Sequence, residues 1–317
     1  MNTSMKFSLF TASVVSGLQK KMGDDCRVFS NLVKKNNGIE LTGIIVEEKN
    51  CNTSPTIYID DFYDDYQKGA SIDEIVEAVY GMINKNRFTQ SVDLSDFTSY
   101  EKAAKQIAFK LINYEKNWEL LKEIPHKAFL NLAIVFYYVV QEPPFYGKAS
   151  ILIRNSHLQA WGIRTEELYR NAMINTPVML PAQIDNIEDA MIGMLTLEGV
   201  GDKWTDSILT KLQEDLKEDE SRIPMYVLSN KQKIQGAACM LYPEILNDFA
   251  KEKNCDLYIL PSSIHEVILL PDSKDISKEN LLDMVSEINK TQVEEHEILA
   301  DSIYYFSRFE KKIERIG

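Results

Sequence analysis

Apolar and polar positions follow two different periods in the first hundred residues of the chain. Between Phe7 and Met22 the apolar side chains recur at helical spacing, which predicts an amphipathic helix rather than a signal peptide. The runs 27–33 and 39–46 are strand-like, and Asn37-Gly38 between them indicates a hairpin turn because both residues tolerate positive φ. The alternation slips at Thr42-Gly43, which predicts a β-bulge there.

A third strand and a second helix complete this first unit. The third strand is expected over 56–59. Ser71 and Glu74 then stand three residues apart at the start of an apolar helical stripe, which is the spacing of a capping box. Residues 1–98 are therefore predicted to form an α+β unit of helix, three-stranded meander and helix.

The middle of the chain has a mixed pattern. A helix-rich stretch is expected from Tyr100 to Lys122. Residues 129–140 predict a buried strand because they are β-branched and aromatic, although their length makes a helix the competing interpretation. A helix over 165–174 is expected to stop at Pro177, and 178–222 resembles a connector.

The last hundred residues have the clearest periodicity. The pattern predicts strands and helices in the order β-α-β-β-α-β, at 224–228, 234–251, 257–260, 266–270, 278–288 and 298–306. This order is that of a split β-α-β unit. The chain is therefore expected to belong to the α+β class, with parts 1–98, 99–221 and 222–317.

Charge and composition exclude several functional classes. The 317 residues carry a formal net charge of −13, which disfavours direct binding to nucleic acid or to anionic lipid. The chain has no apolar run of the roughly 18 residues that a membrane span requires. We therefore expect neither a nucleic-acid partner nor a membrane.

The sequence also lacks the spacings of common cofactor and metal sites. Cys26, Cys51, Cys239 and Cys255 form no C-x-x-C pair and fit no zinc pattern, so we expect free thiols in a reducing cytoplasm. Gly199-Val200-Gly201 does not complete a phosphate-binding loop. The sequence predicts no metal and no cofactor.

Several segments together carry a family resemblance. They are Lys35-Asn36-Asn37-Gly38, Ser54-Pro55-Thr56-Ile57-Tyr58-Ile59 with Phe62-Tyr63, Lys110-Leu111-Ile112-Asn113-Tyr114-Glu115, and the run from Leu257 to Val267. Over nearly the whole chain the sequence resembles an uncharacterised family, a domain of unknown function from anaerobic gut Firmicutes. The resemblance implies a cytosolic bacterial protein and supplies no activity, cofactor or catalytic residue.

The densest polar cluster is Ser262-Ser263-Ile264-His265-Glu266, between two predicted strands. Ser263, His265 and Glu266 supply the hydroxyl, imidazole and carboxylate of an activated nucleophile. On an extended chain Glu266 points away from the other two, so a carboxylate from elsewhere, such as Asp301, is the alternative. The competing interpretation is a turn after Pro261 in which the serines bond to the backbone.

A second candidate is the acidic and aromatic run from Tyr58 to Tyr66. Its spacing does not match a calcium loop, so we interpret it as a binding surface for a protein partner. The residues assigned to this surface are Tyr58, Asp60, Asp61, Tyr63, Asp64 and Asp65.

These observations favour a cytosolic, non-catalytic protein-binding or regulatory protein with an acidic, aromatic-bearing surface. One alternative is a hydrolase that uses Ser263 and His265 with a distant carboxylate. Another is an acidic DNA mimic or anti-defence protein, which would need a continuous stripe of carboxylates.

Overall fold

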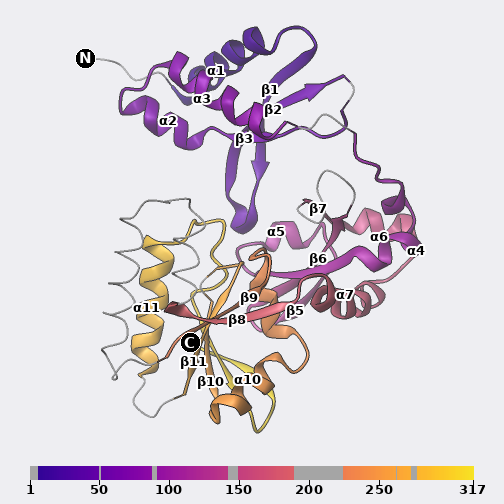
Figure 1. The fold of residues 1–317 in the computed structure, drawn as a ribbon, viewed down its shortest axis with the longest axis vertical. Helices are drawn as coiled ribbons and strands as arrows, with labels where there is room; N and C mark the ends of the chain where they lie inside the picture. Colours follow the sequence, from indigo (N-terminus) through magenta and orange to yellow (C-terminus); the bar gives the residue numbers. More distant parts are fainter. Residues whose placement is uncertain are drawn as a thin grey trace, which may run out of the picture. The chain divides into compact units, whose positions relative to one another are not determined.

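The computed structural model describes residues 6–49, 51–87, 91–141, 149–188, 224–261, 263–272 and 277–317. By its internal contacts the chain divides into two compact units. Unit 1 comprises Met1–Lys102 and Val139–Ser150, and unit 2 comprises Ala103–Tyr138 and Ile151–Gly317. The boundary predicted near residue 221 lies outside the described residues. The α+β class is confirmed, since the described residues form three antiparallel sheets together with helices (Figure 1).

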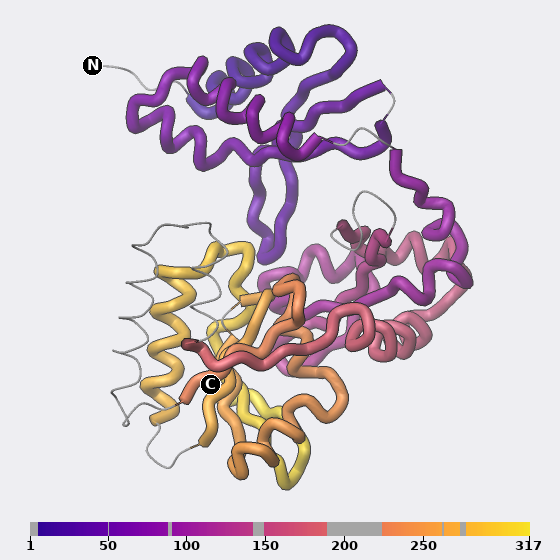
Figure 2. Tube along the Cα trace, viewed as in Figure 1, coloured from indigo at the N-terminus to yellow at the C-terminus, as the bar shows by residue number. Residues whose placement is uncertain are grey.

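Unit 1 is a three-stranded sheet with helices on one face. Its sheet has the order β1-β2-β3. The elements are α1 (Phe7–Met22), β1 (Cys26–Lys34), η1 (Asn36–Gly38), β2 (Glu40–Glu48), β3 (Thr56–Tyr58), α2 (Asp60–Gln67), α3 (Ile72–Lys85) and η2 (Ser95–Thr98). The predicted helices and strands are confirmed, and α2 is an additional helix within the acidic run. The hairpin of β1 and β2 extends beyond the helices of this unit as a two-stranded arm (Figure 2).

Local signals explain most of unit 1. The stripe of α1 buries Phe10, Val14 and Leu18 against the sheet. Both hydrogen bonds of the capping box between Ser71 and Glu74 form at the start of α3, as predicted. The predicted bulge at Thr42-Gly43 is wrong.

Strands β1 and β2 instead pair one to one, from Cys26 opposite Glu48 to Lys34 opposite Glu40. The apolar alternation slips because Gly43 must lack a side chain. A Cβ atom at Gly43 would lie 2.4 Å from Thr56 Cγ2 on the adjacent strand β3.

The first sheet of unit 2 is built around a strand with every residue buried, and two of its strands include residues of the segment Val139–Ser150 that is assigned to unit 1. Its elements are α4 (Tyr100–Ala103, at the unit boundary), η3 (Ala104–Gln106), β4 (Ile107–Asn113), α5 (Trp118–Leu121), β5 (His126–Phe129), β6 (Leu132–Val140), β7 (Ala149–Leu152), α6 (Asn155–Trp161) and α7 (Thr165–Met179). Strand β6 lies between β4 and β5. It confirms the strand interpretation of 129–140 from Leu132 onward, whereas Phe129 ends β5 and Leu130 lies in the turn with a positive φ of 54°. The helix-rich prediction for Tyr100–Lys122 is wrong at its centre, where β4 is a strand.

Helix α7 does not stop at Pro177 as predicted. It continues to Met179 with the proline inside it. The two residues before the proline bind the helix to η3 and β4. Asn175 Nδ2 donates to the carbonyls of Ala104 and Ile107, and Thr176 Oγ1 accepts from the Phe109 N–H. These tertiary hydrogen bonds outweigh the local effect of the proline.

The second sheet of unit 2 has the order β13-β12-β10-β11-β9-β8. Its elements are β8 (Ala182–Asn186), β9 (Tyr226–Asn230), η4 (Gly236–Leu241), α10 (Ile245–Lys253), β10 (Leu257–Leu260), β11 (Val267–Pro271), α11 (Lys278–Thr291), β12 (Ile303–Ser307) and β13 (Lys312–Ile316). The split β-α-β prediction is confirmed, because β11 lies between β9 and β10, and β10 lies between β11 and β12. Helix α11 covers one face with Leu281 and Val285. The predicted strand 298–306 begins only at Ile303.

Candidate functional site

The cluster predicted at 262–266 lies in the turn between β10 and β11. Ser262 is outside the described residues. Ser263 is 9% exposed, and its Oγ accepts a hydrogen bond of 3.0 Å from the backbone N–H of His265. The Ser263 N–H donates in turn to the Glu266 carbonyl over 3.2 Å. These two bonds close a tight turn, so the observed role of the Ser263 hydroxyl is to accept from the main chain.

Both ring nitrogens of His265 face groups other than Ser263. The Gln235 N–H donates to Nδ1 over 3.2 Å, which makes Nδ1 an acceptor and leaves the proton of the neutral ring on Nε2. Nε2 lies 3.4 Å from Glu297 Oε1. The imidazole thus joins the 231–235 loop to the 297 segment, which are far apart in sequence.

The backbone around His265 is tightly packed against the end of β9. The Ser229 hydroxyl donates to the His265 carbonyl over 2.8 Å. Gln235 has a positive φ of 55°, and Gly236 follows it with no room for a side chain. This arrangement fixes a loop junction, and it gives the hydrolase that uses Ser263, His265 and Glu266 no geometric support. The alternative carboxylate, Asp301, is not a hydrogen-bond partner of the imidazole in this arrangement. Its carboxylate accepts from Asn289 Nδ2.

The predicted binding surface divides into structural and exposed residues. Asp60 Oδ2 accepts from the Thr42 N–H over 2.8 Å and so joins α2 to β2. The Tyr63 ring is partly buried against the core of unit 1, 5.0 Å from the Phe7 ring and 5.2 Å from the Phe10 ring. The Tyr58 ring carries Lys35 Nζ at 4.1 Å from its centroid. Asp60, Tyr63 and Tyr58 therefore hold the helix and strand in place.

The other three aspartates of this surface are exposed. Asp61, Asp64 and Asp65 lie on α2, and Asp65 forms a 3.8 Å ion pair with Lys68, which is also exposed. Solvent screening makes such a pair weak, so these carboxylates remain accessible to a partner. Helix α2 thus presents an acidic face to solvent, while its Tyr63 packs against Phe7 and Phe10.

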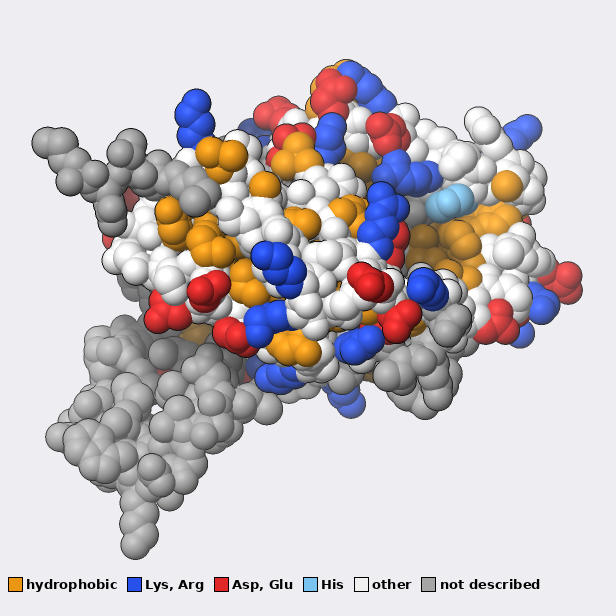
Figure 3. Space-filling model, turned by 90° about the horizontal axis from the view of Figure 1, so that it is seen from above, with side chains coloured by type: hydrophobic (Ala, Val, Ile, Leu, Met, Phe, Trp, Pro, Cys, Tyr) orange, Lys and Arg blue, Asp and Glu red, His pale blue; other side chains and the backbone are white. Residues whose placement is uncertain are grey.

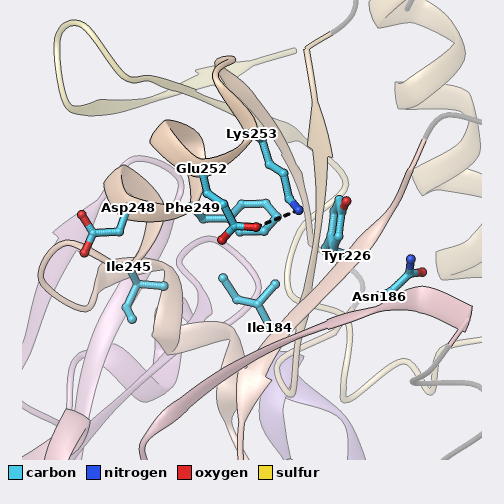
Figure 4. A pocket seen from close by; sticks show the side chains of 8 residues that line it. All are labelled: Ile184, Asn186, Tyr226, Ile245, Asp248, Phe249, Glu252 and Lys253. Atoms are coloured by element: carbon cyan, nitrogen blue, oxygen red, sulfur yellow. Dashed lines mark ion pairs between the residues drawn. The ribbon is translucent and has the colours of Figure 1, made fainter.

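A hollow between β8, β9 and α10 has no counterpart among the sites predicted from the sequence. Its volume is about 370 Å³, and its lining residues are Ile184, Asn186, Tyr226, Ile245, Asp248, Phe249, Glu252 and Lys253 (Figure 4). Lys253 Nζ lies 4.6 Å from the centroid of the Tyr226 ring and 5.3 Å from that of Phe249. The only local signal was the i, i+4 spacing of Phe249 and Lys253 on one helix.

Two of the charged residues of this hollow pair with each other. Lys253 Nζ pairs with Glu252 Oε1 at 2.9 Å. The hydrogen bonds that the Lys253 ammonium donates, first to Glu252 and then to Tyr226, raise its pKa. The Lys253 ammonium thus lies over both aromatic rings and is already paired with a carboxylate.

Two of the four cysteines have thiols whose pKa is raised by burial. All four are free thiols. Cys239 is fully buried beside Tyr242, and burial raises the pKa of its thiol to about 12. Burial also raises the pKa of Cys255. A thiol with a raised pKa is a poor nucleophile at neutral pH.

The described residues provide neither a metal-binding cluster nor a helix that could span a membrane. No three His, Cys, Asp or Glu side chains there lie close enough together to hold a metal ion. Among the described helices, none combines the length and hydropathy needed to span a bilayer. On the face drawn in Figure 3, acidic and basic side chains are interspersed, and the described part of that face carries no continuous acidic stripe.

Comparison with known proteins identifies a family and no function. No curated protein and no solved structure matches the chain. The model of DUF5688, a family of unknown function, matches residues 7–308. This match covers nearly the whole chain and confirms the resemblance to a domain of unknown function. The chain belongs to the DUF5688 family.

Proposed function

We propose that this protein is a non-catalytic binding protein and that the exposed face of α2 contacts a basic segment of a partner protein. The observation that carries the proposal is the trio of exposed carboxylates, Asp61, Asp64 and Asp65, on one short helix. Tyr63 fixes this helix against Phe7 and Phe10, so little ordering is required when a partner binds. Complementary charge would steer the partner to this face.

We also propose that the protein works in the cytoplasm of a bacterium of the Firmicutes. The free state of all four cysteines supports a reducing compartment. The sequence segments that resemble the gut Firmicutes family support the bacterial origin.

A charge-neutralising variant tests the α2 surface. Asp61→Asn, Asp64→Asn and Asp65→Asn in one chain remove three charges from α2. Asp283→Asn, Glu287→Gln and Glu294→Gln, all exposed in unit 2, form a control of equal charge change. Chemical crosslinking in a host lysate followed by mass spectrometry would identify the captured proteins.

We expect the wild type and the control to crosslink the same basic protein through α2, and the α2 variant to lose it. Because each exposed carboxylate contributes modestly, the expected loss is about tenfold in captured partner. Recovery of the same proteins, in the same amounts, by all three chains would refute the proposed surface.

A further inference from the structure

Among the residues that the structure describes, strand β1 is an edge strand whose outward backbone groups are only partly satisfied. Within the described residues it pairs with β2 alone. At its beginning the Gln19 side chain takes the place of a neighbouring strand: its Oε1 accepts from the Val28 N–H over 2.9 Å, and its Nε2 donates to the Cys26 carbonyl over 3.0 Å. The backbone groups of Cys26 and Val28 therefore point away from β2.

Because β1 pairs with β2 in a regular register, the direction of the other backbone groups of β1 follows from that of Cys26 and Val28. Successive residues of an antiparallel strand point their N–H and C=O groups alternately to either side, and no bulge interrupts β1. Ser30, Leu32 and Lys34 consequently face outward like Val28. The hydrogen bond from the Lys35 N–H to the Ile39 carbonyl, 2.7 Å long, confirms that the odd-numbered residues face β2.

The segment 30–34 is thus an open edge. Ser30, Leu32 and Lys34 are exposed, and the Leu32 side chain is 55% exposed. Proteins usually protect such an edge with a bulge, a proline or a central charge. The segment 30–34 contains no bulge and no proline, and its one charged residue, Lys34, stands at its end and not at its centre.

We propose that the open edge of β1 pairs in antiparallel fashion with the same edge of a second copy of this chain. With a two-fold axis at Leu32, the two Leu32 residues exchange both hydrogen bonds. Ser30 of each copy then lies opposite Lys34 of the other. Gln19 ends the open segment on one side and the η1 turn ends it on the other, so the paired segments match in length.

Self-complementarity favours a second copy over another occupant. A two-fold interface uses the same patch on both subunits. Here the exposed Leu32 lies at the centre of the patch, so the Leu32 side chains of the two copies would cover each other. The two Lys34 side chains face serines and not each other, which avoids like charges at a directly opposed position. The paired segment is smaller than a standard interface of about 800 Å² per partner, so the dimer should be weak and concentration-dependent. This inference does not rest on the α2 surface.

Sedimentation equilibrium of the full chain tests the proposal with two variants of one residue. Leu32→Pro removes an outward N–H and leaves the donors to β2 intact, as proline in an edge strand can. Leu32→Val keeps the N–H and the strand propensity and serves as the control. Since Leu32→Pro deletes two hydrogen bonds across the two-fold axis, we expect about thirtyfold weaker dimerisation, whereas Leu32→Val should stay within about threefold of the wild type.

Hydrogen exchange keeps the test decisive if Leu32→Pro fails to fold. In the wild type, the amides of Ser30, Leu32 and Lys34 should gain protection as protein concentration rises, and those of Asn31 and Val33 should be protected at every concentration. A wild type that stays monomeric into the millimolar range, or a folded Leu32→Pro variant that dimerises as the wild type does, would overturn the proposal. Exchange rates of the Ser30, Leu32 and Lys34 amides that do not change with protein concentration would overturn it as well.

Discussion

Gly236→Ala should destabilise unit 2 by about 3 kcal/mol, at the upper end of the usual cost of overpacking. An added Cβ atom would lie 2.2 Å from Ser229 Oγ, 2.5 Å from the His265 carbonyl oxygen and 2.8 Å from the Asn230 nitrogen. Two of these three atoms belong to the backbone and cannot rotate away. The end of β9 and the turn before β11 would have to separate, which breaks the hydrogen bond from Ser229 to His265.

Urea unfolding followed by circular dichroism measures this effect, with Gly81→Ala as the matched control. Gly81 lies inside α3, and a Cβ atom there meets nothing within 4 Å. Alanine should therefore stabilise unit 1 by up to about 1 kcal/mol through its helix propensity. Opposite signs for the two substitutions are the expected result. An unchanged unfolding midpoint in Gly236→Ala would contradict the close approach of the His265 carbonyl to Gly236.

A Ser229→Ala background separates the contributions to this clash. Removing the hydroxyl relieves the contact with Ser229 Oγ, and the two contacts with the backbone remain. We therefore expect Gly236→Ala to cost about 2 kcal/mol even in this background. Full rescue by Ser229→Ala would show that the serine side chain alone requires the glycine.

Local sequence signals predicted the elements whose stability is decided locally. The stripe of α1, the hairpin turn at Asn37-Gly38 and the capping box of α3 each depend on residues within a few positions of one another. Strand β4 shows the limit of this approach. It is buried on both faces, so its apolar run carries no period that distinguishes a strand from a buried helix.

Long-range contacts decided the features that the sequence did not reveal. At the predicted cluster, the partners of His265 are Gln235 and Glu297, each about thirty residues away, and neither stands in a motif with it. Gly236 carries no chemical group that marks it as part of the same junction. The acidic run was easier to recognise, but its split into structural Asp60 and exposed Asp61 depends on the position of Thr42 in the neighbouring strand.

Asparagine side chains explain why residues 298–302 do not continue strand β12, contrary to the sequence pattern. Asn289 on α11 is 4% exposed, and its Nδ2 donates to the Ala300 carbonyl over 3.0 Å and to Asp301 Oδ1 over 2.8 Å. Asn113 Nδ2 donates to the Leu299 carbonyl over 3.2 Å. Side chains thus satisfy backbone groups that a strand would have paired with its neighbour.

Asn289→Ala should consequently destabilise unit 2 by about 2 kcal/mol, because it leaves the buried carbonyl of Ala300 without its donor. Asn280→Ala, on the exposed face of the same helix, is the matched control and should change the free energy of unfolding by less than about 0.5 kcal/mol. Urea unfolding of both variants gives the difference, and hydrogen exchange should show faster exchange around 298–302 only in Asn289→Ala. Equal effects of the two substitutions would mean that packing of Leu299 and Ala300, both fully buried, holds the segment without the asparagine.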